Sequence, residues 1–390
     1  MALPRRLSVL AALSLIVAAC STPAEQPAKP SATSAPTMAA TVAPAPAADP
    51  ATPACGNGPA LLASMTNRDK LAQLLMVGVT GAADARAVVE NHHVGGIFIG
   101  SWTDLSMLSD GTLASIEQTG PLPLAVSVDE EGGRVSRLSS LIGTQPSARV
   151  LAATHTPDEV YNIALTRGQA MRKLGITIDF APVADVTNAP DDTVIGDRSF
   201  GADPTVVTDY AGAYARGLRD AGLLPVLKHF PGHGHGSGDP HTGSVTTPPL
   251  ADLQANDLIP YRTLTTQGPV GVMVGHLQVP GLTGSDPASL SPAAYALLRS
   301  GDYGGPPFGG PVFTDDLSSM QAISDRMGVA EAALRGLQAG ADVALWVTTD
   351  EVPAVLDRLE KALSAGELTQ AQVDGSVLRM AALKGPNARC

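Results

Sequence analysis

Short apolar runs alternate with amphipathic stretches along most of the chain. Eight runs rich in Val, Ile, Leu and Phe occupy residues 74–79, 94–100, 124–130, 176–183, 224–230, 271–279, 310–316 and 341–347. Stretches of helical length lie between them, among them 158–175, 204–222, 329–340 and 352–366. Continuous apolar strands that alternate with helices are typical of parallel strands buried on both faces. Eight such units predict a single (β/α)8 barrel of the TIM type.

A doubly wound open sheet is the alternative fold for the same alternation. Folds of that kind that bind dinucleotides carry a GxGxxG turn after the first strand. No apolar run of this chain is followed by such a turn. The barrel is therefore the favoured architecture, within the α/β class.

The first twenty residues predict export. Arg5 and Arg6 precede an apolar run over 7–19 that is too short to span a bilayer, as in a secretory signal peptide. The run ends in small residues before Cys20, which resembles the lipobox of bacterial lipoproteins. We expect residues 1–19 to be removed and Cys20 to carry the lipid anchor. An ordinary signal peptide with a chance cysteine is the alternative.

Residues 20–54 differ in composition from the rest of the chain. They consist mainly of Ala, Pro, Ser and Thr with almost no large apolar residue, so they cannot bury enough surface to offset their ordering entropy. We expect a disordered tether here, and one catalytic domain over 55–390. The protein would then lie at the outer face of the cell membrane, attached through lipid.

The charge and the cysteine content limit the possible binding partners and disulfide bonds. The net charge is −12 and no Lys/Arg cluster occurs, which argues against nucleic acid as a partner. Of the three cysteines, Cys55 and Cys390 flank the folded region, and in an oxidising compartment they could form a disulfide. Two free thiols are the alternative. We expect a monomer without a cofactor, since no cofactor motif is present.

Ionisable residues gather where the predicted strands end. In a barrel of this kind the active residues lie at the carboxyl ends of the strands. The strand ends here carry Asp129, Glu130, Glu131, Lys228, His229, His276, Asp315 and Asp316. We therefore predict one functional rim built from these side chains.

Asp315 has the position that a glycosidase nucleophile needs. Cleavage of a glycosidic bond requires one group to protonate the leaving oxygen and another to support the anomeric carbon. A carboxylate at the end of a buried strand has a rigid base for the second task. The alternative role is a helix N-cap for the segment that follows, which Asp fills often.

The loop over 231–243, here called the lid loop, offers the proton donor. Asp239 lies two residues before His241, and a carboxylate on one ring nitrogen orients an imidazole that transfers a proton with the other. A metal site at His233, His235, Asp239 and His241 is an alternative, although the spacing is not a zinc pattern. A solvated loop without function is another. Asp239 and His241 would move with a glycine-rich lid that also carries His235, and His233 would pack within the loop.

Six motifs occur in the order found in family 3 glycoside hydrolases. They are VDEEGGRVSRL (128–138), APVADV (181–186), VIGDRSFGADP (194–204), KHFPGHG with DPH (228–241), VMVGH with DPASLS (272–291) and FTDDL (313–317). The chain resembles the bacterial β-N-acetylglucosaminidase branch of that family over about residues 61–385. Because six ordered motifs are involved, the resemblance is highly specific.

The resemblance implies roles for individual residues. Asp315 would be the nucleophile that forms a glycosyl-enzyme, and His241 with Asp239 would be the acid/base dyad. The sugar hydroxyls would be held by Asp129, Arg198, Lys228 and His229. It implies no metal and no cofactor.

Three departures from the family pattern stand out. Pro240 occupies the middle of the dyad where serine is usual, and His235 stands where aspartate commonly follows PGHG. An extra serine occurs in the LSSM segment over 317–320. The segment leaves a choice between Asp315 and Asp316 as nucleophile, and Asp315 is favoured because it follows the threonine directly.

The expected activity is that of a retaining exo-β-N-acetylglucosaminidase. Its substrates would be GlcNAc-containing glycans or muropeptides from peptidoglycan turnover. A phosphorylase with the same residues is one alternative, because a histidine acid/base repels phosphate less than a carboxylate does. A catalytically silent, sugar-binding lipoprotein is the other.

Overall fold

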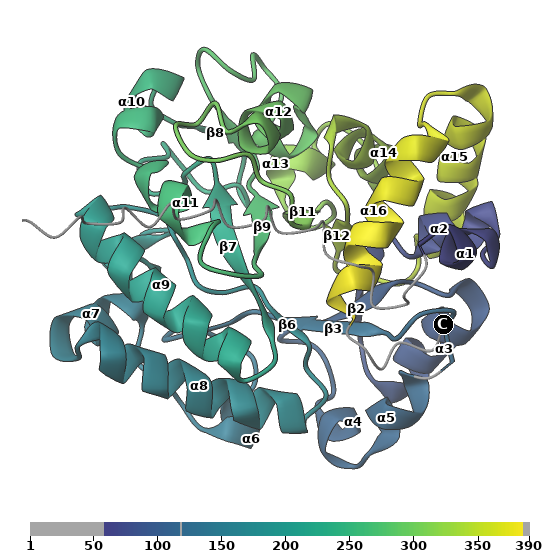
Figure 1. The fold of residues 1–390 in the computed structure, drawn as a ribbon, viewed down its shortest axis with the longest axis horizontal. Coiled ribbons are helices and arrows are strands. Elements are labelled where there is room, and N and C mark those ends of the chain that lie inside the picture. Colours follow the sequence, from purple (N-terminus) through teal and green to yellow (C-terminus); the bar gives the residue numbers. More distant parts are fainter. Residues whose placement is uncertain (1–57, 118, 385–390) are drawn as a thin grey trace, which may run out of the picture. The chain divides into compact units, whose positions relative to one another are not determined.

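Eight parallel strands follow one another around a barrel in chain order (Figure 1). The structure is a computed structural model that describes residues 58–117 and 119–384. The barrel strands are β1 (Leu75–Val79), β2 (Gly96–Ile99), β3 (Ala125–Val128), β6 (Ile178–Asp179), β7 (Leu224–Phe230), β9 (Gly271–Val274), β11 (Val312–Thr314) and β12 (Ala344–Trp346). All eight lie within the predicted apolar runs.

The barrel nearly closes between β11 and β12. The ladders run β11-β9-β7-β6-β3-β2-β1-β12, and one parallel bridge joins Phe313 of β11 to Val343 just before β12. The Thr314 amide also donates to the Val343 carbonyl over 3.0 Å. In a doubly wound sheet the strand order would reverse at a switch point. The predicted barrel is therefore confirmed and the open-sheet alternative is wrong.

Helices cover the outside of the barrel between successive strands. Their bounds are α1 (Gly58–Ala63), α2 (Asn67–Ala72), α3 (Ala82–His92), α4 (Ser106–Ser109), α5 (Thr112–Ile116), α6 (Ser139–Ile142), α7 (Ala148–Thr154), α8 (Pro157–Lys173), α9 (Pro204–Asp220), α10 (Leu250–Ala255), α11 (Ile259–Leu264), α12 (Pro292–Ser300), α13 (Gln321–Ser324), α14 (Val329–Ala339), α15 (Val352–Ala365) and α16 (Gln370–Leu383). Helices α8 and α9 lie side by side in Figure 1.

The starts of the two longest helices explain why they form where they do. The side chain of Thr156 accepts a hydrogen bond from the Glu159 amide, and the Glu159 carboxylate bonds back to the Thr156 amide. This capping box satisfies two amides that the first turn of α8 leaves free. Asp203 caps α9 through a single bond, which its side chain accepts from the Thr205 amide. Both helices then begin with proline, whose φ suits the first helical position.

The interior of the barrel is filled by apolar side chains. Phe98, Phe180 and Phe313 lie in contact, with ring centroids 5.9 Å and 5.5 Å apart. Met273 and Leu345 belong to the same buried cluster. Phe98, Met273 and Leu345 also line a pocket at the carboxyl ends of the strands. This cluster therefore forms the apolar floor of that pocket.

Short elements leave the barrel at its carboxyl end. They are the antiparallel pair β4 (Glu130–Gly132) and β5 (Val135–Ser136), the parallel pair β8 (Val245–Thr246) and β10 (Leu277–Gln278), and the 3₁₀ turns η1 (Gly196–Arg198) and η2 (Ala288–Leu290). The β8–β10 pair follows the lid loop directly. These excursions build the walls of the active-site pocket.

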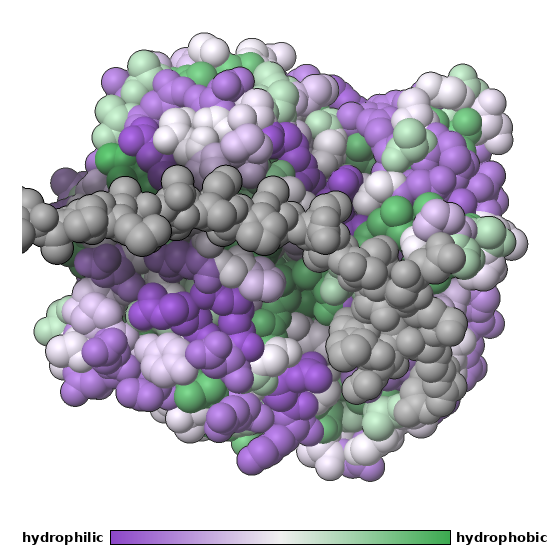
Figure 2. Space-filling model, in the orientation of Figure 1, coloured by the Kyte–Doolittle hydropathy of each residue, from purple (hydrophilic) through white to green (hydrophobic). Residues whose placement is uncertain are grey.

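A second cavity lies at the opposite, amino end of the strands. Its volume is about 1580 Å³, and its walls include Leu124, Ile178, Leu224, Met380 and Leu383. Figure 2 shows hydrophobic side chains in a hollow between α9 and α16, whereas the surface over α8 and α9 is mostly hydrophilic. The residues predicted to be functional lie at the other end of the barrel, where the strands have their carboxyl ends.

Several predictions fall outside the described residues. These are the signal peptide over 1–19, the lipid anchor at Cys20, the tether over 20–54 and the disulfide between Cys55 and Cys390. Within the described part of the chain, no helix is long and apolar enough to cross a membrane.

Candidate active site

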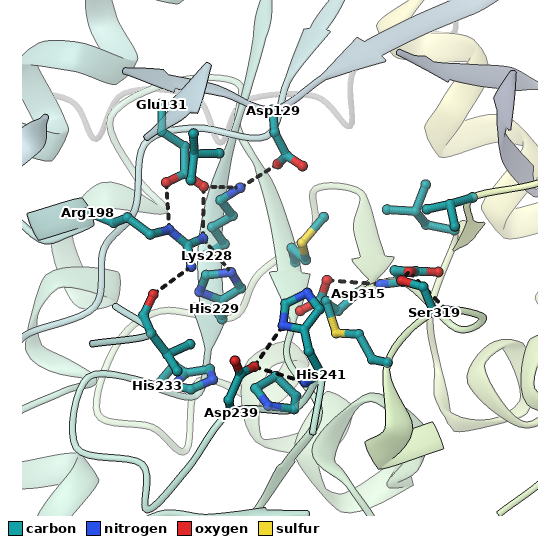
Figure 3. A pocket seen from close by; sticks show the side chains of 18 of the residues that line it. Asp129, Glu131, Arg198, Lys228, His229, His233, Asp239, His241, Asp315 and Ser319 are labelled. Carbon is teal, nitrogen blue, oxygen red and sulfur yellow. Dashed lines mark hydrogen bonds and ion pairs between the residues drawn. The ribbon is translucent and has the colours of Figure 1, made fainter. Parts of the chain in front are cut away.

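A pocket of about 290 Å³ opens at the carboxyl ends of the barrel strands (Figure 3). The loops and strand ends that surround it bring together all of the side chains predicted to act on the sugar. These are Asp129, Arg198, Lys228, His229, Asp239, His241 and Asp315. Placement in one pocket is what their predicted roles require.

A buried charge cluster forms one wall of the pocket. Glu131 accepts two hydrogen bonds from Arg198, at 2.8 and 2.9 Å, and its carboxylate lies 2.6 Å from Nζ of Lys228. Lys228 also donates to Asp129 over 2.6 Å. Burial alone would raise the pKa of Glu131, but the charges of Arg198 and Lys228 hold it well below its usual range. The cluster is therefore ionised and fixed in place.

Asp129 keeps part of its carboxylate free for a ligand. Its side chain is 22% exposed, whereas the side chains of Glu131 and Lys228 are 4% and 3% exposed. Oδ1 accepts from Lys228, and within the described residues no donor reaches Oδ2. A sugar hydroxyl can therefore donate to this oxygen while Lys228 holds the side chain.

Asp185 orients His229. Its Oδ2 lies 2.7 Å from Nδ1 of His229, while Oδ1 accepts from the amides of His229 and His233. Burial would raise the pKa of Asp185, but the neighbouring His229 and His233 lower it. A carboxylate on Nδ1 leaves Nε2 of His229 directed at the pocket, 3.4 Å from Arg198. Lys228 and His229 both line the pocket, and the peptide bond that joins them is cis.

His233 packs within the lid loop, as predicted, but it also lines the pocket. Its ring meets that of His229 edge to face, with centroids 5.7 Å apart. Burial, together with His229, lowers the pKa of His233, so that the ring is neutral. No described residue hydrogen-bonds to its buried Nε2.

Asp315 and Asp316 follow β11 but have different surroundings. The Asp316 carboxylate accepts from the amides and hydroxyls of Ser318 and Ser319, so it is occupied by the turn that precedes α13. Asp315 accepts only the Asp316 amide among described donors, over 2.9 Å, and lines the pocket. The helix N-cap role weighed for Asp315 is not seen: the N-cap of α13 is Met320, and Asp316 rather than Asp315 bonds to the turn before that helix.

The charge state of Asp315 suits a nucleophile. Burial would raise its pKa, but His276 and His229 outweigh that effect and lower it. His276 is 1% exposed; its Nε2 donates to the Asp316 carbonyl over 2.7 Å, and its Nδ1 lies 2.6 Å from the Ser289 hydroxyl. His276 thus fixes the backbone immediately after Asp315.

The lid loop carries the predicted dyad at the open side of the pocket. Oδ1 of Asp239 accepts from Nδ1 of His241 over 2.7 Å and from the His241 amide over 2.9 Å. Burial would raise the pKa of Asp239, but these hydrogen bonds lower it. The His241 side chain is 56% exposed, and its ring faces the same cavity as Asp315 in Figure 3. No described residue hydrogen-bonds to Nε2 of His241, so this atom can exchange a proton.

Besides the bond from the His233 amide to Asp185, three contacts hold the lid loop in place. His235 pairs with Asp257 over 2.9 Å, the Ser237 amide donates to the Thr246 carbonyl over 2.9 Å, and the Pro240 carbonyl accepts from the Ala322 amide over 3.1 Å. The predicted swing of the loop requires these contacts to break. Within the described residues no group of three or more His, Cys, Asp or Glu side chains is arranged to hold a metal ion.

Glu130 was predicted at the functional rim but faces away from the pocket. It is fully buried, and it accepts hydrogen bonds from Arg167 of α8 and from the Leu138 amide. It thereby ties the β4–β5 hairpin to the outer helix layer. Gly133 lies in the turn of this hairpin with a φ of +56°, and an added Cβ would meet Ser147 at 2.7 Å. The second glycine of the DEEGG motif is therefore a requirement of the turn.

Other residues of the site had no individual role assigned from the sequence. Glu131 was predicted only as a member of the functional rim, and Asp185, which does not line the pocket but orients His229, lay only within a quoted motif. Arg137 also lines the pocket, and no described residue accepts a hydrogen bond from its guanidinium group. The apolar side of the pocket had no sequence signal, because its residues resemble core: Phe98, Trp102, Met273, Met320, Leu345 and Val347.

Comparisons with known proteins agree with this geometry. Residues 66–383 match the model of the glycosyl hydrolase family 3 N-terminal domain. The chain is 67% identical to "Beta-hexosaminidase LpqI" of Mycobacterium tuberculosis (strain ATCC 25618 / H37Rv), over 100% of both chains. The solved structure "M tuberculosis LpqI" matches with a TM-score of 0.84 at 72% identity, over 86% of this chain and 98% of that chain.

A more distant solved structure has the same fold. It is a family 3 β-N-acetylglucosaminidase from Paenibacillus sp. str. FPU-7, with a TM-score of 0.77 at 34% identity over 82% of this chain and 62% of that chain. The family match covers the whole barrel, including every motif quoted from the sequence. The resemblance is thus confirmed: the chain belongs to glycosyl hydrolase family 3 and is a glycoside hydrolase.

Proposed function

We propose that the protein is a retaining exo-β-N-acetylglucosaminidase that removes terminal GlcNAc from peptidoglycan-derived fragments. The enzyme class, β-N-acetylhexosaminidase, is the one named for its relatives, including the full-length relative at 67% identity. The observation that carries the mechanism is one pocket that joins an ionised, unoccupied Asp315 to the Asp239–His241 pair.

In the first step Asp315 attacks the anomeric carbon. A bond forms between its carboxylate oxygen and C1 as the bond from C1 to the leaving oxygen breaks. His241, as imidazolium, gives its Nε2 proton to that oxygen, so the departing sugar leaves as an alcohol. Asp239 holds the ring through Nδ1, 2.7 Å away, and its negative charge stabilises the imidazolium.

In the second step water completes the double displacement. His241, now neutral, takes a proton from a water molecule, whose oxygen attacks C1 as the bond to Asp315 breaks. The products are free β-GlcNAc and an ionised Asp315. Because His241 is exposed on the lid loop, water can reach it once the leaving group has departed.

The buried cluster would hold the terminal sugar. Asp129 and His229 offer acceptors, and Arg198 and Lys228 offer donors, within a pocket of about 290 Å³. That volume is at the lower end of the range for small-molecule sites and suits one monosaccharide. A pocket of that size favours cleavage from a chain end over cleavage within a chain.

The location and natural substrate remain part of the proposal. The lipobox-like Cys20 would anchor the enzyme to the outer face of the cell membrane, where peptidoglycan fragments are released. Release of GlcNAc from a GlcNAc–MurNAc disaccharide tests the substrate. Failure to act on it, with good turnover of chitooligosaccharides, would contradict the peptidoglycan assignment. Radiolabelling with palmitate, with Cys20→Ala as the control, tests the anchor.

Phosphorolysis is the second candidate, because the acid/base is a neutral or cationic histidine. A carboxylate in its place would repel an incoming phosphate, whereas His241 would not. Reaction with a chromogenic β-GlcNAc substrate in phosphate buffer separates the two outcomes. Free GlcNAc supports the hydrolase, GlcNAc-1-phosphate supports the phosphorylase, and no turnover would leave a sugar-binding lipoprotein.

A further inference from the structure

Trp102 places a large exposed aromatic ring on the rim of the active-site pocket. It is 45% exposed and lines the pocket from the loop after β2. The other exposed large apolar side chains in the described part of the chain, Leu141 and Val150, do not line it. An exposed indole beside a binding pocket is a feature that a ligand would cover.

The indole is held rigidly from behind. Its ring packs against Phe98, with centroids 6.0 Å apart and planes inclined by 55°. It also lies directly over Gly100, where an added Cβ would meet indole carbons at 2.4 Å. Thr103 fixes the loop by accepting from the Gly100 amide over 3.0 Å and donating to the Val79 carbonyl over 2.6 Å. The ring is therefore a preorganised surface, with little conformational entropy to lose on binding.

The two ends of the pocket differ in exposure, and this difference indicates which part of the substrate contacts Trp102. The polar groups that suit sugar hydroxyls are buried, with Lys228 and His229 only 2% and 6% exposed. The dyad residue that must reach the glycosidic oxygen, His241, has a 56% exposed side chain. The glycosidic bond therefore lies towards the open side, and the leaving group extends beyond it into the rim. Trp102 belongs to that exposed rim.

We propose that Trp102 forms a leaving-group subsite, on which the pyranose ring attached to the scissile oxygen stacks. The inference rests on the proposed glycosidase function and adds the residue that selects the leaving group. One face of a pyranose in the β-linked series presents C–H groups, which pack on the face of an indole. Recognition by stacking accepts any equatorially substituted pyranose. The subsite would therefore favour sugar leaving groups over small alcohols, without distinguishing closely related sugars.

Two substrates that differ only in the leaving group test the proposal. N,N′-diacetylchitobiose carries a pyranose on the scissile oxygen, whereas methyl β-N-acetylglucosaminide carries a methyl group, and both leaving groups need a proton. In Trp102→Ala we expect kcat/KM for diacetylchitobiose to fall about five- to tenfold, mainly through KM. For the methyl glycoside it should change by less than about twofold, because its terminal sugar is unaffected. Trp102→Phe should lie between.

Controls separate this effect from a general loss of fold. Val150→Ala removes an equally exposed apolar side chain, 46%, from α7 outside the pocket, and should change neither substrate. Equal losses on both substrates in Trp102→Ala would place the indole against the terminal sugar and overturn the proposal. Unchanged kinetics on both would overturn it as well. If the unaltered protein hydrolyses neither substrate, the proposed function fails first.

Tryptophan fluorescence gives a readout that does not depend on turnover. The chain has two tryptophans, and Trp346 is fully buried, so quenching by acrylamide reports on Trp102. In Asp315→Asn, saturating diacetylchitobiose should protect Trp102 from acrylamide, and saturating GlcNAc should not. Equal protection by both ligands, or by neither, would contradict a leaving-group subsite. This result also decides the matter if Trp102→Ala does not fold.

Discussion

The two sides of the active-site pocket are built in opposite ways. On one side, Glu131 and Lys228 have side chains only 4% and 3% exposed, and they belong to a network of ion pairs that joins the segment after β3 to β7 and to the η1 turn. On the other side, Asp239 and His241 have side chains 36% and 56% exposed, and they bond mainly to each other. Charges that are buried need partners, whereas charges that water reaches do not.

This difference matches two tasks. In the proposed mechanism, a fixed, water-poor wall would hold the terminal sugar in one orientation without reorganisation during the reaction. The proposed proton-transfer group would instead meet a leaving sugar first and a water molecule afterwards, and it lies where solvent has access. Asp315 stands between them: it is buried like the first group, but no described cation forms an ion pair with its carboxylate.

The largest expected effect is the loss of the nucleophile. Asp315→Ala should lower kcat/KM by about ten thousandfold or more for every leaving group, because no covalent intermediate can form. The matched control is Asp316→Ala, which removes the neighbouring carboxylate that bonds to Ser318 and Ser319. We expect Asp316→Ala to act mainly on stability: its melting temperature should fall, whereas its kcat/KM should fall far less than that of Asp315→Ala. A larger activity loss in Asp316→Ala than in Asp315→Ala would reverse the assignment.

The next effect depends on the leaving group. In His241→Ala, kcat/KM for an alkyl glycoside should fall about 10²- to 10⁴-fold, because the leaving oxygen lacks its proton donor. The value for 2,4-dinitrophenyl β-N-acetylglucosaminide, which needs no proton, should stay near that of the unaltered protein. His235→Ala is the control from the same lid loop, since His235 pairs with Asp257 away from the dyad. Equal losses on both leaving groups in His241→Ala would count against its role.

The buried wall should be sensitive in stability as well as in binding. Glu131→Gln leaves Arg198 and Lys228 without their shared counter-charge, and we expect the free energy of unfolding at pH 7 to fall by about 3 to 5 kcal/mol. KM should rise because Arg198 loses its two-point support. Asp239→Asn, on the exposed side, should change the free energy of unfolding by no more than about 1 kcal/mol. Denaturant titration measures the free energy of unfolding of both variants. An equal fall in the two would contradict the difference between the buried and the exposed side of the pocket.

The smallest effect is a pH dependence of that stability difference. The pKa of Glu131 in the folded protein lies below its ordinary value of 4.5. Its ionised form therefore stabilises the fold above that value, and the contribution declines as the pH falls further. The gap in unfolding free energy between the unaltered protein and Glu131→Gln should narrow below about pH 4.5. A gap that widens there would contradict the ion-pair account.

The fold was largely predictable because its signal is local and repeated. Each barrel strand is a continuous apolar run, and the two longest helices begin at a cap followed by proline, a pattern visible in the sequence, as at Thr156–Pro157. The catalytic candidates were predictable from motifs at strand ends. The choice between Asp315 and Asp316 had only the family pattern to guide it, and the structure separates them by the serines that occupy Asp316.

The rest of the site could not be predicted from the sequence, because it depends on which buried side chains come into contact in the folded protein. Asp185 had no individual prediction and Glu131 was only one member of the predicted rim. Their contacts with His229 and Arg198 join segments that are far apart in the chain. Glu130 occupies a strand end like its neighbours, yet it turns outwards to α8. Trp102 had no motif at all. The signal peptide, Cys20 and the Cys55–Cys390 disulfide remain predictions.

The central claim is that Asp315 becomes covalently glycosylated. In His241→Ala, 2,4-dinitrophenyl β-N-acetylglucosaminide should glycosylate the enzyme quickly, while hydrolysis of the intermediate is slow because it lacks a base. Intact-protein mass spectrometry should then find one added N-acetylhexosamine residue, and peptide mapping should place it on Asp315. A modification on any other residue would contradict the account. So would the absence of any covalent adduct while the variant turns over this substrate slowly.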